Sequence, residues 1–441
     1  MAEFLPVGLE LDGGTVRVSI WDGQKPGHIP GASEFPALVG IADEQFFWGA
    51  EAQKLQLKLP DCVLTLEECL AEKALIGAGL PIYTGAVLLE NYWIALHRTL
   101  EARLEMPCSI ECIAVPWQIS YHARILLSNS LNECCYTERT HVVDSAACIL
   151  YQYQHHTNFR FRGAVMLCHL GAGGAELTLA KLDSDTLEIL NSVWMPDCSA
   201  QAIQNELAEL CLILTRQSRE QLPHLLQQLR YQFGALAAVD GVTLYGSAGP
   251  TEISRQDVLN ALEKRLPRLS LAFEALCTDA VLPEEGLGGV LLSGALAALP
   301  GVEDTLSPVF EGRPIVLEGG SRAADGACLI AAKRIIALPP ARSSLLLNCA
   351  GTDCYLMEVD TGRILAAIPH WATFPIEVEA KELTRPGAAY QVVLSTGEHE
   401  LEVVPPGPYL AEGAVRLAVM IDVDHNIHLQ TVQKKSHYPY N

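Results

Sequence analysis

Two runs of alternating apolar residues near the start of the chain flank a short glycine turn that follows Asp12 and contains Gly13 and Gly14. Alternation with a period of two is typical of a strand that buries one face. Asp-Gly and Gly-Gly pairs supply the positive φ angles that tight hairpin turns require. The pattern therefore predicts a β-hairpin over residues 7–23.

The same pattern of strand, glycine turn and strand returns over residues 164–182, with its turn at residues 171–174. Between the two hairpins, an apolar strand is predicted over residues 110–115 and helices over residues 87–104 and 122–132. Strands that alternate with helices predict an α/β domain. The repeated hairpin predicts that this domain is built from two similar halves.

Beyond the second hairpin the pattern becomes mostly helical and then changes again. Helices are predicted over residues 202–214, 219–236, 255–271 and 323–336, with one buried strand over residues 288–294. After a proline-containing stretch, short alternating runs dominate. We therefore predict an α/β domain over residues 1–337, a linker over 338–344, a small all-β module over 345–434 and a disordered tail over 435–441.

Composition narrows the classes of partner. The 441 residues include 30 Lys and Arg against 52 Asp and Glu, which gives a formal net charge of −22 at pH 7. Nucleic acids and anionic membranes are bound through clustered cations, and the longest basic run is the pair Lys434 and Lys435. We therefore expect neither a nucleic acid nor a membrane as a partner. No apolar stretch reaches the roughly 18–20 residues that cross a bilayer, and no signal peptide is recognisable, so we expect a cytoplasmic protein.

The 14 cysteines lack the spacing of zinc ligands, so we expect free, mostly buried thiols and no metal site formed by them. The glycine turns offer more chemistry. Backbone N–H groups that are exposed in a tight turn form a concave site for anions, which side chains at those positions would obstruct. Each turn is therefore either a phosphate-binding loop or simply the end of a hairpin.

The order of the motifs resembles that of the seventy-kilodalton heat-shock chaperone (DnaK) family, whose ATPase domain has the actin and sugar-kinase fold. The matching segments are residues 7–23 (first phosphate loop), 35–39, 49–53, 114–116, 142–147 (first connecting motif), 170–174 (second phosphate loop), 291–295 (adenosine motif), 323–327 (second connecting motif), 402–408 and 415–424 (closing strands of the substrate-binding sandwich). The resemblance implies a two-lobed, actin-like nucleotide-binding domain of ribonuclease H-like repeats, followed by a β-sandwich that binds peptides.

The resemblance also implies which residues would line a nucleotide site. The positions that would hold nucleotide are Glu10, Asp12, Gly13, Gly14, Gly171, Gly173, Gly174 and Gly294. The positions of catalytic groups are altered: Gln53 stands in place of a lysine (with Lys54 one residue away), Asp144 in place of a glutamate and His169 in place of an aspartate. Phosphoryl transfer depends on such groups for positioning and electrostatic stabilisation, so we expect ATP hydrolysis to be very slow or absent.

Asp12 is the most informative of these departures, because it places a carboxylate where the family's loop would receive phosphate. Two like charges about 4 Å apart repel by roughly 4 kcal/mol at an effective dielectric constant of about 20. Asp12 therefore acts either as a charge that repels nucleotide or as a residue that caps its own turn.

The function that we expect is that of an atypical, lidless DnaK-like chaperone or co-chaperone component. It would bind protein partners or peptides, including a J-domain protein or another chaperone, with ATP or ADP bound weakly and magnesium present only with nucleotide. Two alternatives stay open. One is an active ATP-dependent chaperone in which Glu10, Asp144, Glu176 and Lys54 take over metal and phosphate contacts, and the other is a small-molecule kinase of the same fold.

Overall fold

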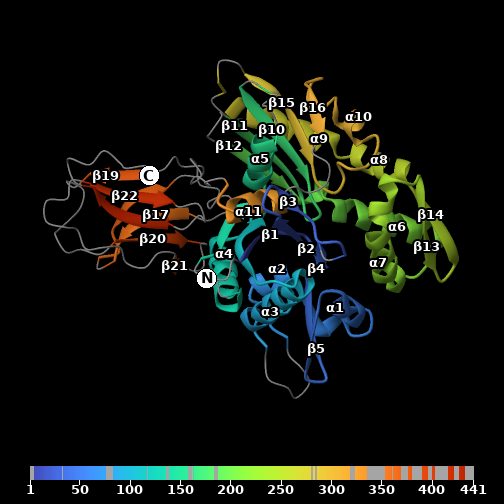
Figure 1. The fold of residues 1–441 in the computed structure, drawn as a ribbon. Coiled ribbons are helices and arrows are strands. Elements are labelled where there is room, and N and C mark those ends of the chain that lie inside the picture. The colour runs from blue at the N-terminus through green and yellow to red at the C-terminus, as the bar shows by residue number, and fades with distance from the viewer. Residues whose placement is uncertain are drawn as a thin grey trace.

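A computed structural model gives the structure of the chain, which is a mixed α/β protein with several β-sheets (Figure 1). The described residues are 4–334 without 32, 76–82, 117, 136–138, 157–160, 162, 183–186, 280–281, 284–285 and 318–322, together with 353–359, 361–368, 376–379, 390–395, 400–402, 416–421 and 427–432. The predicted linker (338–344) and tail (435–441) lie outside the described residues.

The first sheet contains the predicted N-terminal hairpin. Its strands run in the order β3-β2-β1-β8-β9, and β4 also pairs with β2. Their bounds are β1 (Leu5–Asp12), β2 (Thr15–Trp21), β3 (Pro26–Gly27), β4 (Glu34–Pro36), β8 (Cys108–Val115) and β9 (His141–Asp144). β1 is antiparallel to β2 and parallel to β8, and β8 is parallel to β9. The hairpin over residues 7–23 is confirmed.

The second sheet repeats this arrangement. Its order is β12-β11-β10-β15-β16, with bounds β10 (Ala164–Leu170), β11 (Ala175–Leu182), β12 (Leu187–Met195), β15 (Leu287–Ser293) and β16 (Ile315–Leu317). β10 is antiparallel to β11 and parallel to β15, and β15 is parallel to β16. Both sheets therefore join three antiparallel strands to two parallel ones in the same order, as the repeated hairpin led us to expect.

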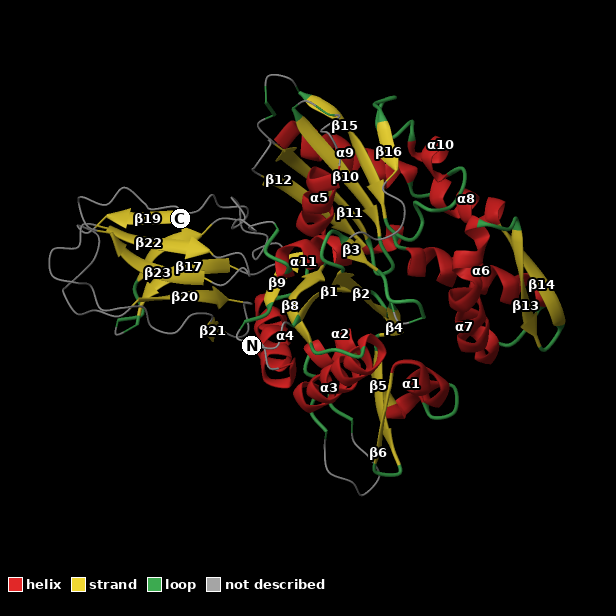
Figure 2. Cartoon of the chain, viewed as in Figure 1, coloured by secondary structure: helices red, strands yellow, loops and turns green. Residues whose placement is uncertain are grey.

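Two helices lie between the sheets (Figure 2): α5 (Ser145–His156), which contacts strands of both, and α11 (Ala323–Ala331), which packs on α5, β1 and β8. The packing is very close. A Cβ atom at Gly8 of β1 would lie 2.1 Å from the backbone nitrogen of Cys328, and one at Gly326 would lie 2.0 Å from the carbonyl oxygen of Cys148. Only glycine allows these backbones to approach so closely, and the buried contacts fix the sheets relative to each other.

The remaining elements before residue 334 lie beside these two sheets or pack on the helices next to them. Beside the first sheet lie β5 (Leu38–Ala42), β6 (Gln45–Trp48), β7 (Val63–Thr65), α1 (Gly49–Gln56), α2 (Leu66–Leu70), α3 (Gly85–Leu104) and α4 (Tyr121–Cys135). The others are α6 (Ala200–Thr215), α7 (Leu222–Gln232), β13 (Gly241–Gly246), β14 (Gly249–Ser254), α8 (Arg255–Glu263), α9 (Leu266–Asp279), α10 (Val302–Leu306) and short 3-10 helices at Pro60–Cys62, Pro196–Cys198, Arg219–Gln221 and Phe233–Ala237.

Two predicted helices are divided. The segment 219–236 forms a 3-10 turn, α7 and a second 3-10 turn, and the segment 255–271 is split between α8 and α9. Pro223 and Pro267 each occupy the second position of a new helix. Proline has no N–H to donate, so it fits the first turn of a helix and interrupts a longer one. Helical periodicity alone carries no sign of such a break.

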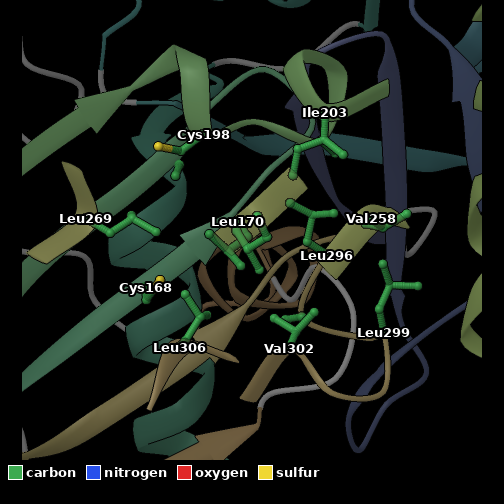
Figure 3. Close-up of a cluster of buried hydrophobic side chains, with 14 of the residues drawn as sticks. Cys168, Leu170, Cys198, Ile203, Val258, Leu269, Leu296, Leu299, Val302 and Leu306 are labelled. Atoms are coloured by element: carbon green, nitrogen blue, oxygen red, sulfur yellow. The ribbon is translucent and has the colours of Figure 1, made fainter. Parts of the chain in front are cut away.

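A large apolar cluster packs beneath the second sheet, and Figure 3 shows part of it. Leu170, the last residue of β10, is fully buried there together with Leu296 and Ile203. Leu170 immediately precedes the glycine turn at residues 171–174, while Ile203 lies on α6, which begins just beyond β12. The cluster therefore anchors the strand that carries this turn.

The described residues beyond 334 that form regular elements are all strands, in agreement with the predicted all-β character of residues 345–434. They form two sheets, β18-β17-β20-β21 and β19-β22-β23. Their bounds are β17 (Asp353–Glu358), β18 (Ile364–Ile368), β19 (Ile376–Glu379), β20 (Tyr390–Ser395), β21 (Glu400–Glu402), β22 (Arg416–Ile421) and β23 (Ile427–Val432). Contacts of β18 with β19 and of β20 with β23 bring the two sheets together.

Within the described part of the chain, no helix has the length and apolar character needed to span a bilayer. The cysteines whose side chains are described are free thiols, as expected from their spacing.

Candidate functional site

The two glycine turns meet at the centre of the domain. The first turn (Gly13 and Gly14) joins β1 to β2, and the second turn (residues 171–174) joins β10 to β11. A Cβ atom at Gly13, where φ is +62°, would lie 2.7 Å from the Cβ atom of Ala172 and 3.1 Å from the backbone nitrogen of Gly173. The two turns therefore touch, and their contact requires glycine at position 13.

Asp12 occupies the concave side of the second turn. Its carboxylate accepts hydrogen bonds from the backbone N–H of Ala172, at 3.0 and 3.1 Å, and from that of Gly173, at 3.5 Å. Asp12 is only 2% exposed and its two donors are half-buried, so the carboxylate is largely shielded from water. The carboxylate thus fills the position in which the second turn would hold an anion, a role different from the capping of its own turn.

The ionisation of Asp12 is favoured despite its burial. Desolvation raises the pKa of this carboxyl, but Arg17 and the backbone N–H groups of Ala172 and Gly173 outweigh it and hold the pKa below its ordinary value. A carboxylate that accepts N–H bonds and faces a cation is stabilised in its charged form. Asp12 is therefore an anion at neutral pH.

Arg17 supplies the nearest cation. It lies on β2 directly across from Glu10 on β1, and its Nη1 atom is 3.5 Å from Oε1 of Glu10 and 3.5 Å from Oδ2 of Asp12. Its Nε atom donates to Glu34 at 3.1 Å. Burial disfavours the charged guanidinium, yet Glu10, Asp12 and Glu34 together raise the pKa of Arg17 above its ordinary value.

His169 completes a compact group at the end of β10. One ligand atom each from Glu10, Asp12 and His169 lie within 4.8 Å of one another, and all three residues are buried. Burial lowers the pKa of His169, so its imidazole is neutral at neutral pH. Among the described residues its Nδ1 atom has no hydrogen-bond partner.

This group fits magnesium nucleotide poorly. Magnesium prefers a full set of oxygen ligands, and here one of the three donors is an imidazole. The carboxylates of Glu10 and Asp12 already face Arg17, and Asp12 accepts hydrogen bonds from the N–H groups that a phosphate would use. Phosphate and magnesium would both have to displace groups of the chain itself.

A second buried ion pair lies nearby. Arg124 on α4 donates through Nη2 to Asp144 at the end of β9, and through Nη1 to the carbonyl oxygen of Val142 at 3.1 Å. Arg124 is 3% and Asp144 5% exposed. Asp144, which the resemblance places at a catalytic position, is thereby neutralised within the chain.

Glu176 lies beside this pair with little to stabilise its charge. Its Oε1 atom accepts from the hydroxyl of Thr178 at 2.9 Å, and its Oε2 atom has no hydrogen-bond partner among the described residues. Burial, and then repulsion by Asp144, raises the pKa of Glu176 to about 8. The carboxyl group is therefore mostly protonated at neutral pH and is a poor ligand for a cation.

The other residues singled out from the sequence are distributed as follows. A Cβ atom at Gly171 would lie 3.0 Å from Asp12 Oδ1, one at Gly174 would lie 2.1 Å from the ring of Trp194, and one at Gly294, where φ is +100°, would lie 2.4 Å from the carbonyl oxygen of Leu170. A Cβ atom at Gly14 would meet nothing within 4 Å. Gly171, Gly173, Gly174 and Gly294 therefore gather around the second turn.

Gln53 and Lys54 lie on α1, which packs on β5 and β6. Lys54 Nζ bonds Glu51 at 2.8 Å on the surface, where the Lys54 side chain is 70% exposed. Lys54 is therefore engaged on the surface and does not join the buried group around Asp12.

Three contributors to the site were not identified from the sequence: Arg17, Arg124 and Trp194. Arg17 carried a signal, because a turn of Gly13 and Gly14 places residue 17 across from Glu10. Arg124 lay within an ordinary helical pattern, and Trp194 belongs to a third strand of the second sheet that was not predicted.

No known protein family and no curated protein matches the chain in sequence.

Proposed function

We propose that residues 1–337 form a two-lobed, actin-like domain of two ribonuclease H-like repeats and that residues 345–434 form a β-sandwich. The same strand order in the first and second sheets supports the former. The contact between two antiparallel sheets beyond residue 353 supports the latter. On this arrangement, the glycine turns of the two repeats meet at the position where actin-like proteins hold nucleotide.

We further propose that the chain is an atypical DnaK-like chaperone or co-chaperone component that binds protein partners or peptides and hydrolyses ATP weakly or not at all. One observation carries this proposal: the Asp12 carboxylate accepts the N–H groups of Ala172 and Gly173. A nucleotide phosphate would need the same donors. Occupation of these donors by Asp12 disfavours the binding and hydrolysis of ATP at the two turns.

The charges around the two glycine turns support the same conclusion. An ATPase needs a cation that neutralises the phosphates of ATP. It also needs carboxylates that are free to bind this cation. Here Arg17 faces Glu10 and Asp12, Arg124 is bonded to Asp144, and the pKa of Glu176 is raised to about 8. This balance argues against the alternative in which Glu10, Asp144 and Glu176 replace the metal ligands of an active ATPase.

In this proposal, residues 345–434 bind the peptides and protein partners. Among the described residues of this range, each sheet ends in strands with one neighbour, β18 and β21 in one sheet and β19 and β23 in the other. An extended peptide can add to such an edge through main-chain hydrogen bonds, with pockets for alternate side chains. Partners would be protein clients, a J-domain protein or another chaperone.

Two measurements test the proposal. ATP turnover by the purified full chain, with excess magnesium, is expected to stay at background, and a variant with Glu10→Gln should be indistinguishable from it. Fluorescence anisotropy with labelled extended apolar peptides is expected to show saturable binding that ATP leaves unchanged. Turnover that is abolished by Glu10→Gln, or the absence of any saturable peptide or chaperone binding, would contradict the proposal.

A further inference from the structure

We infer that Asp12 is a built-in substitute for a phosphate anion and that it holds the two glycine turns together without any nucleotide. We call this contact, made by Asp12 with Ala172 and Gly173, the Asp12 latch. The inference explains why the chain fits magnesium nucleotide poorly. It concerns the contact between the two glycine turns and stands apart from the proposed binding of peptides.

The first support is the geometry of the contact. Asp12 ends β1 of the first sheet, while its two donors lie in the turn between β10 and β11 of the second sheet, 160 and 161 residues away. Successive backbone N–H groups that converge on one point form an anion site. A carboxylate oxygen is an anionic acceptor like a phosphate oxygen, and here the chain itself supplies it.

The second support is the way in which the second turn is held from its other side. Backbone N–H groups at the start of α6 donate to this turn: Ala200 to the carbonyl oxygen of Gly171 and Gln201 to that of Ala172, both at 3.1 Å. The turn is therefore attached to α6 through its carbonyl oxygens and to Asp12 through its N–H groups. Releasing Asp12 would leave two half-buried N–H groups without their acceptor in the chain, which is unfavourable where water does not replace it.

The third support is steric. A Cβ atom at Gly13 would lie 2.7 Å from the side chain of Ala172, and one at Gly173 would lie 3.6 Å from the Cα atom of Gly13. The turns are in van der Waals contact beside the carboxylate. Inserting a phosphate between Asp12 and the second turn would require the two sheets to separate locally.

Asp22 provides a matched control, because it is a second aspartate at a turn in the same sheet. Its Oδ1 atom accepts the N–H groups of Gln24 and Lys25, both at 2.8 Å and both in its own turn. Both aspartates accept backbone N–H groups, and only Asp12 reaches across to the second sheet. Asp22→Asn should therefore perturb its own turn alone.

The test is amide hydrogen exchange on the full chain in the absence of nucleotide, in the wild type and in variants Asp12→Asn and Asp22→Asn. The amides of Ala172 and Gly173 are expected to be protected in the wild type. Asp12→Asn should speed their exchange by about tenfold or more, since a hydrogen bond to a charged acceptor becomes one to a neutral amide. Asp22→Asn should leave both unchanged.

Inorganic pyrophosphate distinguishes an anion substitute from a simple structural contact. Calorimetry is expected to detect pyrophosphate binding to Asp12→Gly and no binding to the wild type or to Asp22→Asn, and bound pyrophosphate should restore protection of the two amides. Amides of β10 and β11 serve as the folding control and should exchange alike in all variants.

The inference is wrong if the wild-type amides of Ala172 and Gly173 exchange freely, or if Asp12→Asn leaves their exchange unchanged. If Asp12→Gly exposes the amides but binds no pyrophosphate, the contact is a latch and the anion-substitute part is wrong. Global loss of protection in the Asp12 variants would also overturn the inference, because it assigns Asp12 to a local contact. Peptide binding is measured separately, so failure of the proposed function would be recognised on its own.

Discussion

Removal of the Arg17 guanidinium tests whether the buried charges of the site are balanced from within the chain. Nη1 of Arg17 lies 3.5 Å from an oxygen of Glu10 and 3.5 Å from an oxygen of Asp12. Glu10 is fully buried and Asp12 is 2% exposed. The substitution Arg17→Met keeps most of the aliphatic length and leaves two buried carboxylates close together.

The magnitude follows from the surroundings of each partner. Removing one member of a buried ion pair costs about 3–5 kcal/mol, because the remaining charge is poorly solvated. The third partner, Glu34, has a side chain that is 66% exposed, and an exposed pair contributes about 0–1 kcal/mol. We expect Arg17→Met to lower the free energy of unfolding by about 3–5 kcal/mol, and Glu34→Gln by no more than about 1 kcal/mol.

Urea unfolding followed by tryptophan fluorescence measures both changes, and Trp21 and Trp93 report on the region of the first sheet. Combining Arg17→Met with Glu10→Gln removes one of the two like charges and should recover part of the lost stability, whereas adding Glu34→Gln should recover none. The reasoning is refuted if Arg17→Met destabilises no more than Glu34→Gln does, or if Glu10→Gln fails to rescue it.

The remaining predictions concern the second sheet. The pKa of Glu176 is raised from 4.5 to about 8 in the folded chain. As pH rises, the unfolded state therefore loses this proton first, and the free energy of unfolding falls between the unfolded and the folded pKa. Glu176→Gln should therefore flatten the fall in unfolding free energy from pH 5 to 8 and be the more stable protein at pH 8; an unchanged pH profile would contradict the assigned protonation. Gly174→Ala should destabilise by about 1–3 kcal/mol through overpacking against Trp194, as measured by thermal unfolding, and Trp194→Leu should relieve this cost; a neutral Gly174→Ala would show that the ring moves freely.

The hairpins were predictable because their signal is local. Alternating apolar residues on both sides of Gly13, and again around the second turn, fix both the strands and their pairing. The turn also sets the register, so Arg17 across from Glu10 could have been read from the same pattern. The two divided helices were missed because Pro223 and Pro267 fall within otherwise continuous apolar periods, and a proline in a first turn looks like part of the helix that it begins.

The role of Asp12 was not predictable, because its partners lie 160 and 161 residues away. From the local sequence, Asp12 is equally suited to cap its own turn or to face an incoming phosphate. The hypothesis of repulsion applied only to an inward-facing carboxylate, and it considered only the interaction between Asp12 and a ligand. The structure adds that Arg17 and two N–H groups stabilise that carboxylate, which therefore occupies the N–H groups of the second turn itself.

This difference matters for how strongly an external phosphate is excluded. An anion that belongs to the chain competes as an intramolecular ligand, and even a flexible short tether gives an effective concentration of about millimolar. Asp12 is positioned by a strand and buried, so it loses little further freedom when it binds the second turn. A nucleotide present below that effective concentration must therefore bind the turn more tightly than Asp12 does, without a free cation from Arg17. In the proposed function, occupancy by Asp12 would therefore disfavour nucleotide binding even where screening weakens the repulsion.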